Sequence, residues 1–258
     1  MSNENQLKIN NLSVSYPGNK VLEKLSFSVN GLCAVVGQNG CGKTTLLKAI
    51  SQLIESSGEI TFENTDIKTL SLKERSRLIS YIPQKTGVAE DMSVLDVVLS
   101  AFNSRLSMFE NPGSSQVQTA KNALKLVGMQ DFDERNYSTL SAGQQQLCII
   151  ARTVAEDTKL WLLDEPDSAL DITNRYSTMN LLSNIAKEKG VTGLVTLHDP
   201  MLALYSCEKV IVISDGGCAG IIDTKTDSQT CIENILNKAF KGVKLVKALD
   251  RYAIFPCC

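Results

Sequence analysis

Histidine is nearly absent from this chain: His198 is the only one among 258 residues. Protein sites for zinc and similar metals combine several nitrogen or sulfur ligands, and here no second imidazole exists for such a site. The eight cysteines form no C-x-x-C pair, and free thiols in a reducing compartment are the simplest interpretation. His198 must therefore take its role from other neighbours in the chain.

Long apolar runs and a surplus of basic residues are also missing. No stretch approaches the roughly 18 apolar residues that a membrane-spanning helix needs. The opening MSNENQLKIN has no apolar core of a signal peptide. We therefore expect a cytosolic chain, whose work at a membrane would pass through a partner. With 26 basic and 28 acidic residues the net charge is −2, which argues against a nucleic-acid partner.

What the chain does have is an ordinary globular composition, 43% hydrophobic and 21% charged, which is enough for a sizeable core. We see no internal repeat and no low-complexity linker. The length fits one large domain or two closely joined ones, and we expect residues 1–258 to form a single domain.

Apolar periodicity divides the chain into regions of different character. Up to about Gln84 the pattern favours strands with one clear helix over KTTLLKAISQLI. From 85 to about 135 it favours helices, with ENPGSSQ as a loop, and a further helix follows over QQQLCIIARTVAED. Beyond it, strands and helices alternate: LWLLDE, TNRYSTMNLLSNIAKEKG with its C-terminal glycine, VTGLVTLH and KVIVISDG. This order predicts an α/β fold, with a parallel sheet wrapped by helices and a helical subdomain inserted before Ser141.

A glycine-rich loop provides the strongest chemical signal. GQNGCGKT, residues 37–44, fits G-x-x-x-x-G-K-[ST] and lies between a predicted strand and a predicted helix. Glycines let backbone N–H groups turn toward a phosphate, the helix N-terminus adds partial positive charge, and Lys43 neutralises the outer phosphates. The Thr44 hydroxyl can bind Mg²⁺. The nucleotide-binding residues expected here are Gly37, Asn39, Gly40, Cys41, Gly42, Lys43, Thr44 and Thr45.

Two cysteine positions could have a chemical role. Cys41 lies inside the loop, where amide dipoles would favour its thiolate, but we favour the alternative of a small filler residue. The adjacent Cys257 and Cys258 could carry a lipid or a redox function, and there too free thiols are the favoured interpretation.

A pair of acidic residues, Asp164 and Glu165, ends the apolar segment LWLLDE. Parallel strands deliver their C-terminal residues to one sheet edge, so the pair should lie beside the phosphate loop. Neighbouring side chains of a strand point in different directions. Asp164 can therefore hold Mg²⁺ while Glu165 polarises an attacking water. An acidic strand end that merely faces solvent is the alternative, which the phosphate loop disfavours.

Three further motifs occur in a fixed order. YIPQ ends at Gln84, LSAGQ spans residues 140–144, and SALD follows the carboxylates at residues 168–171. Together with the phosphate loop, the carboxylate pair and His198, these motifs resemble those of the ATP-binding-cassette family over nearly the whole chain.

The resemblance implies a fold in three parts. A P-loop NTPase core of the RecA type and an antiparallel β subdomain take residues 1–84 and 155–258. An α-helical subdomain takes about 85–154. LSAGQ differs from the family's LSGGQ signature at Ala142, which replaces a glycine.

The resemblance also implies a composite ATP site that two chains share in a head-to-tail homodimer. Ser141, Gly143 and Gln144 of one subunit would face the γ-phosphate that Lys43 of the other subunit holds. Ser141 begins a helix, so its hydroxyl and the N-terminal amides form an anion site. Asp171 would lie at the interface between the subunits.

Three more positions take roles from the same resemblance. Gln84 would sense Mg²⁺ and the attacking water and couple them to the helical subdomain. His198 would contact the γ-phosphate and orient the water, and a histidine that only caps a strand end is the alternative. Tyr16 in VSYPGNK would stack on adenine, against the alternative of an aromatic on a strand face.

An ATPase of this kind passes its work to another chain. The resemblance implies permease subunits that dock on the helical subdomain, where DMSVLDVVLSAFNSRLSMFENP carries apolar residues, and an extracytoplasmic substrate-binding protein. The chain would lie on the inner face of the cell membrane. This segment, the residues after His198 and the compact length resemble ATPases that import iron–siderophores, haem and cobalamin.

Other classes of function compete with this one. A P-loop kinase would share Lys43 and Mg²⁺ but has no need of LSAGQ or His198. A GTPase is disfavoured because no N-K-x-D motif is present. A soluble cassette protein that works on DNA or ribosomes would carry two cassettes or a long coiled-coil insert. The serious rival is the ATPase subunit of an exporter with a separate membrane chain.

Overall fold

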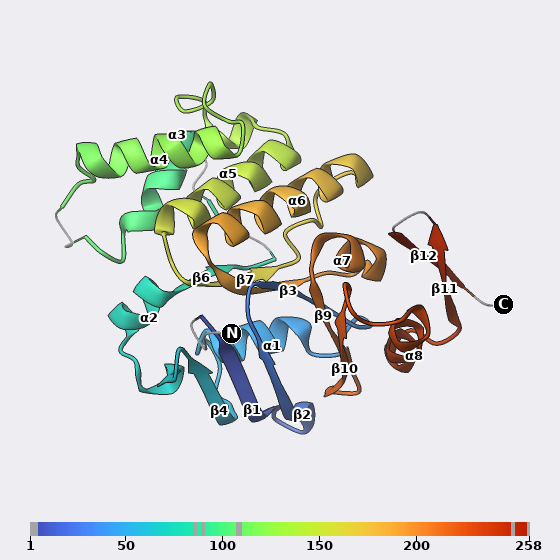
Figure 1. Ribbon diagram of the computed structural model, residues 1–258. Helices are drawn as coiled ribbons and strands as arrows, with labels where there is room; N and C mark the ends of the chain where they lie inside the picture. Colours follow the sequence, from blue (N-terminus) through green and yellow to red (C-terminus); the bar gives the residue numbers. More distant parts are fainter. Residues whose placement is uncertain (1–4, 85–86, 89–90, 107–109, 249–250, 257–258) are drawn as a thin grey trace.

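A six-stranded sheet lies at the centre of the structure, a computed structural model that describes residues 5–84, 87–88, 91–106, 110–248 and 251–256 (Figure 1). Its strand order is β10-β9-β3-β8-β7-β6, and β10 alone in that sheet runs antiparallel to its neighbour. The strands are β3 (Leu32–Val36), β6 (Ile79–Ile82), β7 (Leu160–Asp164), β8 (Thr192–Thr196), β9 (Lys209–Ser214) and β10 (Gly217–Asp223). β3, β7 and β8 are buried along their whole length, as expected for strands covered on both faces.

A second, antiparallel sheet packs on the other side of helix α1 (Lys43–Ile50) (Figure 1). It has the order β2-β1-β4-β5 and contains β1 (Leu7–Tyr16), β2 (Asn19–Val29), β4 (Ser57–Phe62) and β5 (Thr65–Asp66). Leu46, Leu47 and Ile50 of α1 are fully buried in the core between the two sheets. The antiparallel β subdomain expected from the family resemblance is therefore present.

Helices cover the opposite face of the central sheet (Figure 1). They are α3 (Val94–Leu99), α4 (Ser114–Leu126), α5 (Ala142–Glu156) and α6 (Ile172–Lys189), with the short turns η2 (Ser100–Phe102) and η3 (Tyr137–Thr139) between them. A second core joins them to the sheet, and its largest member is Trp161 of β7. α6 ends at Gly190, whose φ of 65° matches the predicted C-terminal glycine.

Two expectations about local structure before Ser141 were wrong. α2 (Leu72–Leu78) is a second helix before Gln84, next to the turn η1 (Ile67–Thr69). None of its residues is buried, so no apolar stripe marks it, and a Ser71–Glu74 capping box begins it instead. α4 begins at Ser114, inside the segment expected to be a loop.

The C-terminal part contains elements that the apolar pattern did not predict. After α7 (Pro200–Ser206) and β9, the chain forms α8 (Gln229–Ala239) and a hairpin of β11 (Val243–Ala248) and β12 (Arg251–Pro256). Leu245 of β11 is fully buried, so this tail is packed on the domain. Cys257 and Cys258 lie outside the described residues.

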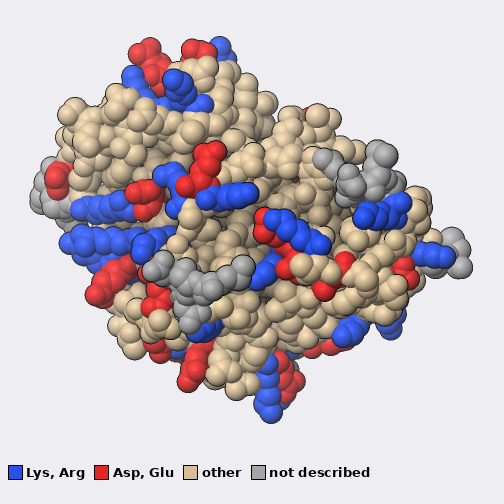
Figure 2. Space-filling view, in the orientation of Figure 1, with Lys and Arg blue, Asp and Glu red and all other residues tan. Residues whose placement is uncertain are grey.

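Charged residues of both signs are interspersed over the surface that Figure 2 shows. The ion pairs Lys159–Glu63 (3.1 Å) and Lys189–Asp157 (2.9 Å) are examples in the structure. Exposed pairs contribute about 0–1 kcal/mol each, so the two apolar cores stabilise the fold far more. Among the described residues, no helix combines the length and the apolar character that crossing a bilayer requires.

Candidate functional site

The loop between β3 and α1 is shaped by close approaches of its backbone to other strands. A Cβ on Gly37 would lie 2.4 Å from the carbonyl oxygen of Ile213, and one on Gly42 would lie 2.6 Å from Leu22 Cδ2. Gly42 also has a φ of 103°, which residues with side chains rarely adopt. No side chain of the described residues caps α1 at Gly42, so the first N–H groups of the helix remain available to a phosphate.

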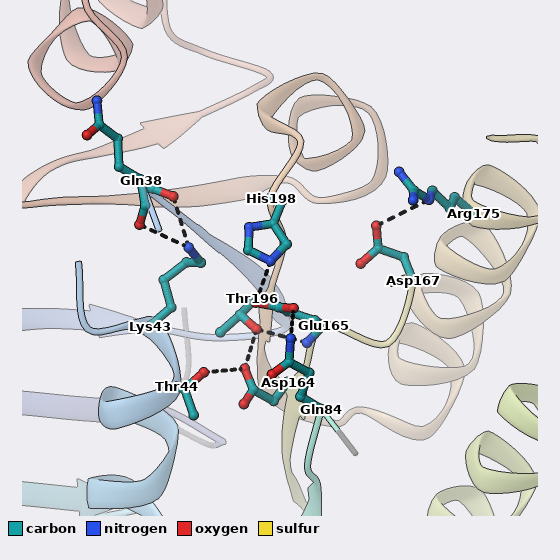
Figure 3. A network of polar contacts seen from close by, with 11 residues as sticks. Gln38, Lys43, Thr44, Gln84, Asp164, Glu165, Asp167, Arg175, Thr196 and His198 are labelled. Carbon is teal, nitrogen blue, oxygen red and sulfur yellow. Dashed lines mark hydrogen bonds and ion pairs between the residues drawn. The ribbon is translucent and has the colours of Figure 1, made fainter. Parts of the chain in front are cut away.

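Lys43 begins α1 and turns back across this loop (Figure 3). The residue is 5% exposed, and its Nζ donates to the carbonyl oxygens of Gly37 (2.9 Å) and Gln38 (3.3 Å). Neutral carbonyls satisfy the hydrogen-bonding needs of the ammonium without neutralising its charge. That charge is therefore still available to an anion bound in the loop.

Thr196, at the end of β8, fixes both carboxylate residues of β7. Its hydroxyl donates to Asp164 Oδ1 (2.7 Å) and accepts the backbone N–H of Glu165 (2.9 Å). Asp164 Oδ1 also accepts from Thr44 Oγ1 (3.1 Å), whereas Oδ2 is buried and has no hydrogen-bond partner among the described residues. Thr196 was not among the residues predicted from the sequence, although its position two residues before His198, at a parallel strand end, is a signal for it.

Glu165 is held on both of its carboxylate oxygens (Figure 3). Gln84 Nε2 donates to Oε2 (2.6 Å), and His198 Nε2 lies 2.5 Å from Oε1. The side chain of Glu165 is 7% exposed, whereas that of His198 is 47% exposed. The backbone of Glu165 has a φ of 51°, in the left-handed region, where the chain leaves β7.

These groups meet because four parallel strands end at one edge of the sheet. Gln84 follows β6, Glu165 follows β7, His198 follows β8, and the loop 37–44 follows β3. The cavity between them has a volume of about 370 Å³. It is lined by Val21, Asn39, Gly40, Gly42, Lys43, Thr44, Thr45, Gln84, Glu165 and His198. Val21 is the member that the sequence analysis did not name.

The LSAGQ residues lie outside this cavity, at the start of α5. Ser141 Oγ accepts the backbone N–H of Gln144 (3.3 Å), and Gln144 Oε1 accepts that of Ser141 (3.1 Å), which forms a capping box. Ser141 and Ala142 are exposed and Gly143 is half-buried. Ala142 adopts the ordinary helical backbone, so the first turn of α5 accepts it in place of glycine.

Asp171 and Tyr16 do not line the cavity either. Asp171 is the N-cap of α6, where its side chain accepts the backbone N–H of Asn174 (2.9 Å), and it borders a separate hollow of about 700 Å³. Tyr16 ends β1 and is 42% exposed. The interface role of Asp171 and the stacking role of Tyr16 stay predictions.

The Cys41 thiol is not activated by its place in the loop. Burial raises its pKa, and the Lys43 ammonium and the backbone N–H groups of the loop oppose that rise only in part. The Sγ atom lies 2.6 Å from where a Cβ on Gly37 would be. Both observations favour the interpretation of Cys41 as a small residue that fills the loop.

The sequence profile of the ABC transporter family matches residues 22–168. The match covers more than half of the chain and includes the phosphate loop, LSAGQ and both carboxylates. This chain belongs to the ABC transporter family. It is an ATPase of that family. The α/β fold of the P-loop NTPases predicted from the motifs is thereby confirmed.

Relatives of this ABC ATPase are similar over most of their length. The probable iron chelatin transport ATP-binding protein of Helicobacter pylori is 36% identical over 213 residues, which cover 81% of this chain and 84% of that protein. A solved chain from a transporter described as metal-chelate type, in an inward-facing conformation, matches with a TM-score of 0.82 and 28% identity, over 99% of this chain and 98% of that one. An ATP-binding cassette solved as a dimer with ADP and Pi, in a post-hydrolysis state, has a TM-score of 0.74 and 25% identity, over 86% and 100% of the two chains.

Proposed function

We propose that this ABC ATPase dimerises head to tail on ATP and powers a membrane permease that imports an iron–siderophore, haem or cobalamin-type substrate. One observation carries the proposal. The phosphate-binding and hydrolytic residues gather in one cavity, whereas Ser141, Gly143 and Gln144 lie outside it. A second copy related by a two-fold axis would bring its own α5 to this cavity and would complete two equivalent sites. The similar cassette solved as a dimer with ADP and Pi supports this arrangement.

Mg²⁺ fits the oxygen atoms at the base of the cavity. Asp164 Oδ2 is buried without a partner, Thr44 Oγ1 contacts the same carboxylate, and Gln84 lines the cavity beside them. Among the described residues no cluster of His, Cys, Asp and Glu could hold a metal ion by itself, which suits an ion that also needs phosphate oxygens and water. When bound, Mg²⁺ would neutralise charge on the outer phosphates.

The residues of the chain divide the hydrolytic work between them. Lys43 and the N–H groups of the loop bind the phosphates, and Glu165 accepts a hydrogen bond from the attacking water. Gln84 and His198 each engage one oxygen of Glu165, and the remaining lone pair of either oxygen can accept the water. The side chain of His198 is 47% exposed and can turn toward the γ-phosphate. Gln84 leads into the helical subdomain, so its movement couples the site to that subdomain.

The permease would dock on the helical subdomain, and the chain would thus lie on the inner face of the membrane. Residues 107–109 of the segment 91–112 lie outside the described residues, and most of its described apolar residues belong to the core, as Val97 and Phe102 do. Asn103 and Ser104 are exposed beside them. An extracytoplasmic binding protein completes the proposed system. The support for import is the similarity to the iron chelatin protein and to the metal-chelate type transporter.

The Glu165→Gln variant tests the dimer. Replacing the carboxylate should lower turnover by about 100-fold or more, because the amide cannot accept a proton from water, while ATP binding persists. With ATP and Mg²⁺ at saturation, light scattering coupled to gel filtration should show a dimer that reverts to monomer when nucleotide is removed. The control is Glu63→Gln, which makes the same chemical change at a surface ion pair. This variant should hydrolyse ATP at the wild-type rate and should stay monomeric. A Glu165→Gln chain that remains monomeric would contradict the composite site.

The direction of transport needs a separate experiment. Cells that lack this chain should lose uptake of a labelled ferric siderophore, haem or cobalamin, and the wild-type gene should restore it. Restoration by Glu165→Gln should fail because hydrolysis drives the cycle. If the cells instead accumulate a solute that the wild type expels, the chain serves an exporter with a separate membrane subunit, and the import proposal is wrong.

A further inference from the structure

Asp167 is a buried carboxylate that the mechanism above does not use. It lies two residues after Glu165 and is 4% exposed. Its Oδ2 is 4.0 Å from Arg175 Nε, and its Oδ1 is buried without a hydrogen-bond partner among the described residues. Buried carboxylates are normally hydrogen-bonded because the unpaired group is costly, so an incompletely satisfied one beside a reaction centre indicates a role.

The charges around Asp167 come from both sides of the site. In Figure 3 its carboxylate lies between the Arg175 side chain and the His198 ring. Burial raises the pKa of Asp167, and the Glu165 carboxylate adds to that rise. Its own backbone N–H, the Arg175 guanidinium and His198 act in the opposite direction. The charges of Glu165, His198 and Arg175 therefore all act on the Asp167 carboxylate.

Hydrogen bonds close the loop that follows Glu165 on itself. The backbone N–H of Leu170 donates to the carbonyl oxygen of Asp167 (3.1 Å), and Arg175 Nε donates to the carbonyl oxygen of Leu170 (2.9 Å). The Leu170 side chain is buried and lies 3.4 Å from where a Cβ on Gly143 would be. The loop is therefore braced against α6 through Arg175 and against the first turn of α5 through Leu170.

Glu165 needs such a brace because of its backbone. A non-glycine residue at a φ of 51° costs of order 1–3 kcal/mol and persists only where its surroundings over-determine it. Thr196 holds the N–H of Glu165 (2.9 Å), and the N–H of Ser168 donates to its carbonyl oxygen (3.2 Å). The next residue of the loop with contacts of this kind is Asp167, through its carbonyl oxygen to Leu170 and its carboxylate to Arg175.

We propose that Asp167 is a positioning residue for ATP hydrolysis: through its ion pair with Arg175 (4.0 Å), it stabilises the loop after Glu165 and thereby the orientation of the Glu165–His198 pair. This inference rests on the proposed roles of Glu165 and His198 and deepens them. Asp167 does not line the cavity beside Lys43, so it is not assigned a contact with ATP. Its effect passes through the backbone of the loop, and Arg175 links the same loop to α6, whose N-terminus carries Asp171.

The test is a double-mutant cycle on the full chain with Asp167→Asn, Arg175→Gln and the combined variant. We expect each single change to lower kcat by about tenfold while KM and the Kd for ATP stay within about twofold, because positioning acts on the transition state and not on binding. The combined variant should be no slower than the slower single variant, because both changes break one brace. Arg175→Lys, which keeps the charge, should recover part of the loss. Asp157→Asn makes the same chemical change at an exposed pair and should leave kcat unchanged.

Several results would overturn the inference. They are an Asp167→Asn chain with the kcat of the wild type, losses that multiply in the combined variant, or a change in KM with kcat intact. If Asp167→Asn does not fold, the comparison of Arg175→Gln with Arg175→Lys decides, because the Arg175 side chain is 38% exposed and tolerates replacement. A wild-type chain without ATPase activity would contradict the proposed function itself, whereas an active wild type with an equally active Asp167→Asn would contradict this inference alone.

Discussion

Two helix N-termini are expected to face phosphate in this protein, and the structure prepares them differently. The N-cap of α1 is Gly42, which has no side chain to cap the helix, and the buried Lys43 side chain lies against the preceding loop. α5 begins with a complete Ser141–Gln144 capping box on the surface. The first terminus is therefore preorganised to bind an anion, whereas the second satisfies its own N–H groups. If the proposed dimer is right, the N-terminus of α1 binds phosphate within one subunit, whereas that of α5 acts only on phosphate that a second subunit holds.

The largest effect is expected from a change that disables phosphate binding at the N-terminus of α1. Lys43→Ala deletes the charge that the loop carbonyls hold in place, so ATP affinity should fall by about 100-fold or more, as for the loss of hydrogen bonds to a charged group. Titration with a fluorescent ATP analogue measures it. Lys48→Ala, on the same helix, should bind ATP like the wild type. If Lys43→Ala binds ATP normally, α1 is not the phosphate site.

The next largest effect is expected from a variant that weakens the N-terminus of α5 and leaves that of α1 intact. Ser141→Ala, made in the Glu165→Gln background, should weaken ATP-driven dimerisation by about tenfold and leave ATP binding to the monomer unchanged. The measurement is the concentration dependence of dimer formation by sedimentation.

Ser71→Ala provides the matched control for that variant. Ser71 forms the same kind of capping box at α2, so both variants should lose about 1 kcal/mol of stability. Only Ser141→Ala should affect the dimer. Equal dimerisation of the two variants would mean that α5 has no phosphate to bind.

A smaller effect is expected at Thr196, whose hydroxyl bonds the same Asp164 oxygen as Thr44 of α1. Thr196→Val keeps the shape of the side chain but removes the donor to Asp164 and leaves the N–H of Glu165 unpaired. Stability should fall by about 1–3 kcal/mol and kcat by about tenfold. Thr153→Val is the control, because that buried hydroxyl only bonds a carbonyl within α5. Denaturant unfolding and steady-state kinetics measure stability and kcat of the two variants. Equal losses in Thr196→Val and Thr153→Val would show that Thr196 has no special role.

The smallest effect is expected for the Cys41 thiol in the loop 37–44. Because burial raises the pKa of Cys41 above its ordinary value of 9.0, little thiolate exists at neutral pH, and the reactive fraction increases only above that value. Cys41→Ala should keep ATPase activity within about twofold, and iodoacetamide should inactivate the wild type slowly at pH 7. Rapid inactivation that Cys41→Ala abolishes would restore the reactive thiolate as the better interpretation.

Local pattern was sufficient for some elements and insufficient for others. The stripe of Leu46, Leu47 and Ile50 predicted α1, and the wholly apolar segments predicted β3 and β7, because burial there follows directly from residue type. α2 has no buried residue and begins with a capping box, so periodicity could not reveal it. In the same way, Thr196 and Asp167 are polar residues whose importance comes from burial, which a single sequence does not display.

The family, the phosphate loop and the order of the chemical motifs could be recognised without coordinates, because spacing and residue type dictate the local backbone of such motifs. The tertiary structure decided which groups share a cavity. Parallel strands bring Gln84, Glu165 and His198 to one edge, although 81 and 33 residues separate neighbouring members of that set (165 − 84 and 198 − 165). It also placed Ser141 outside that cavity and buried Asp167 next to Arg175. Those outcomes depend on packing between distant segments, which no local pattern encodes.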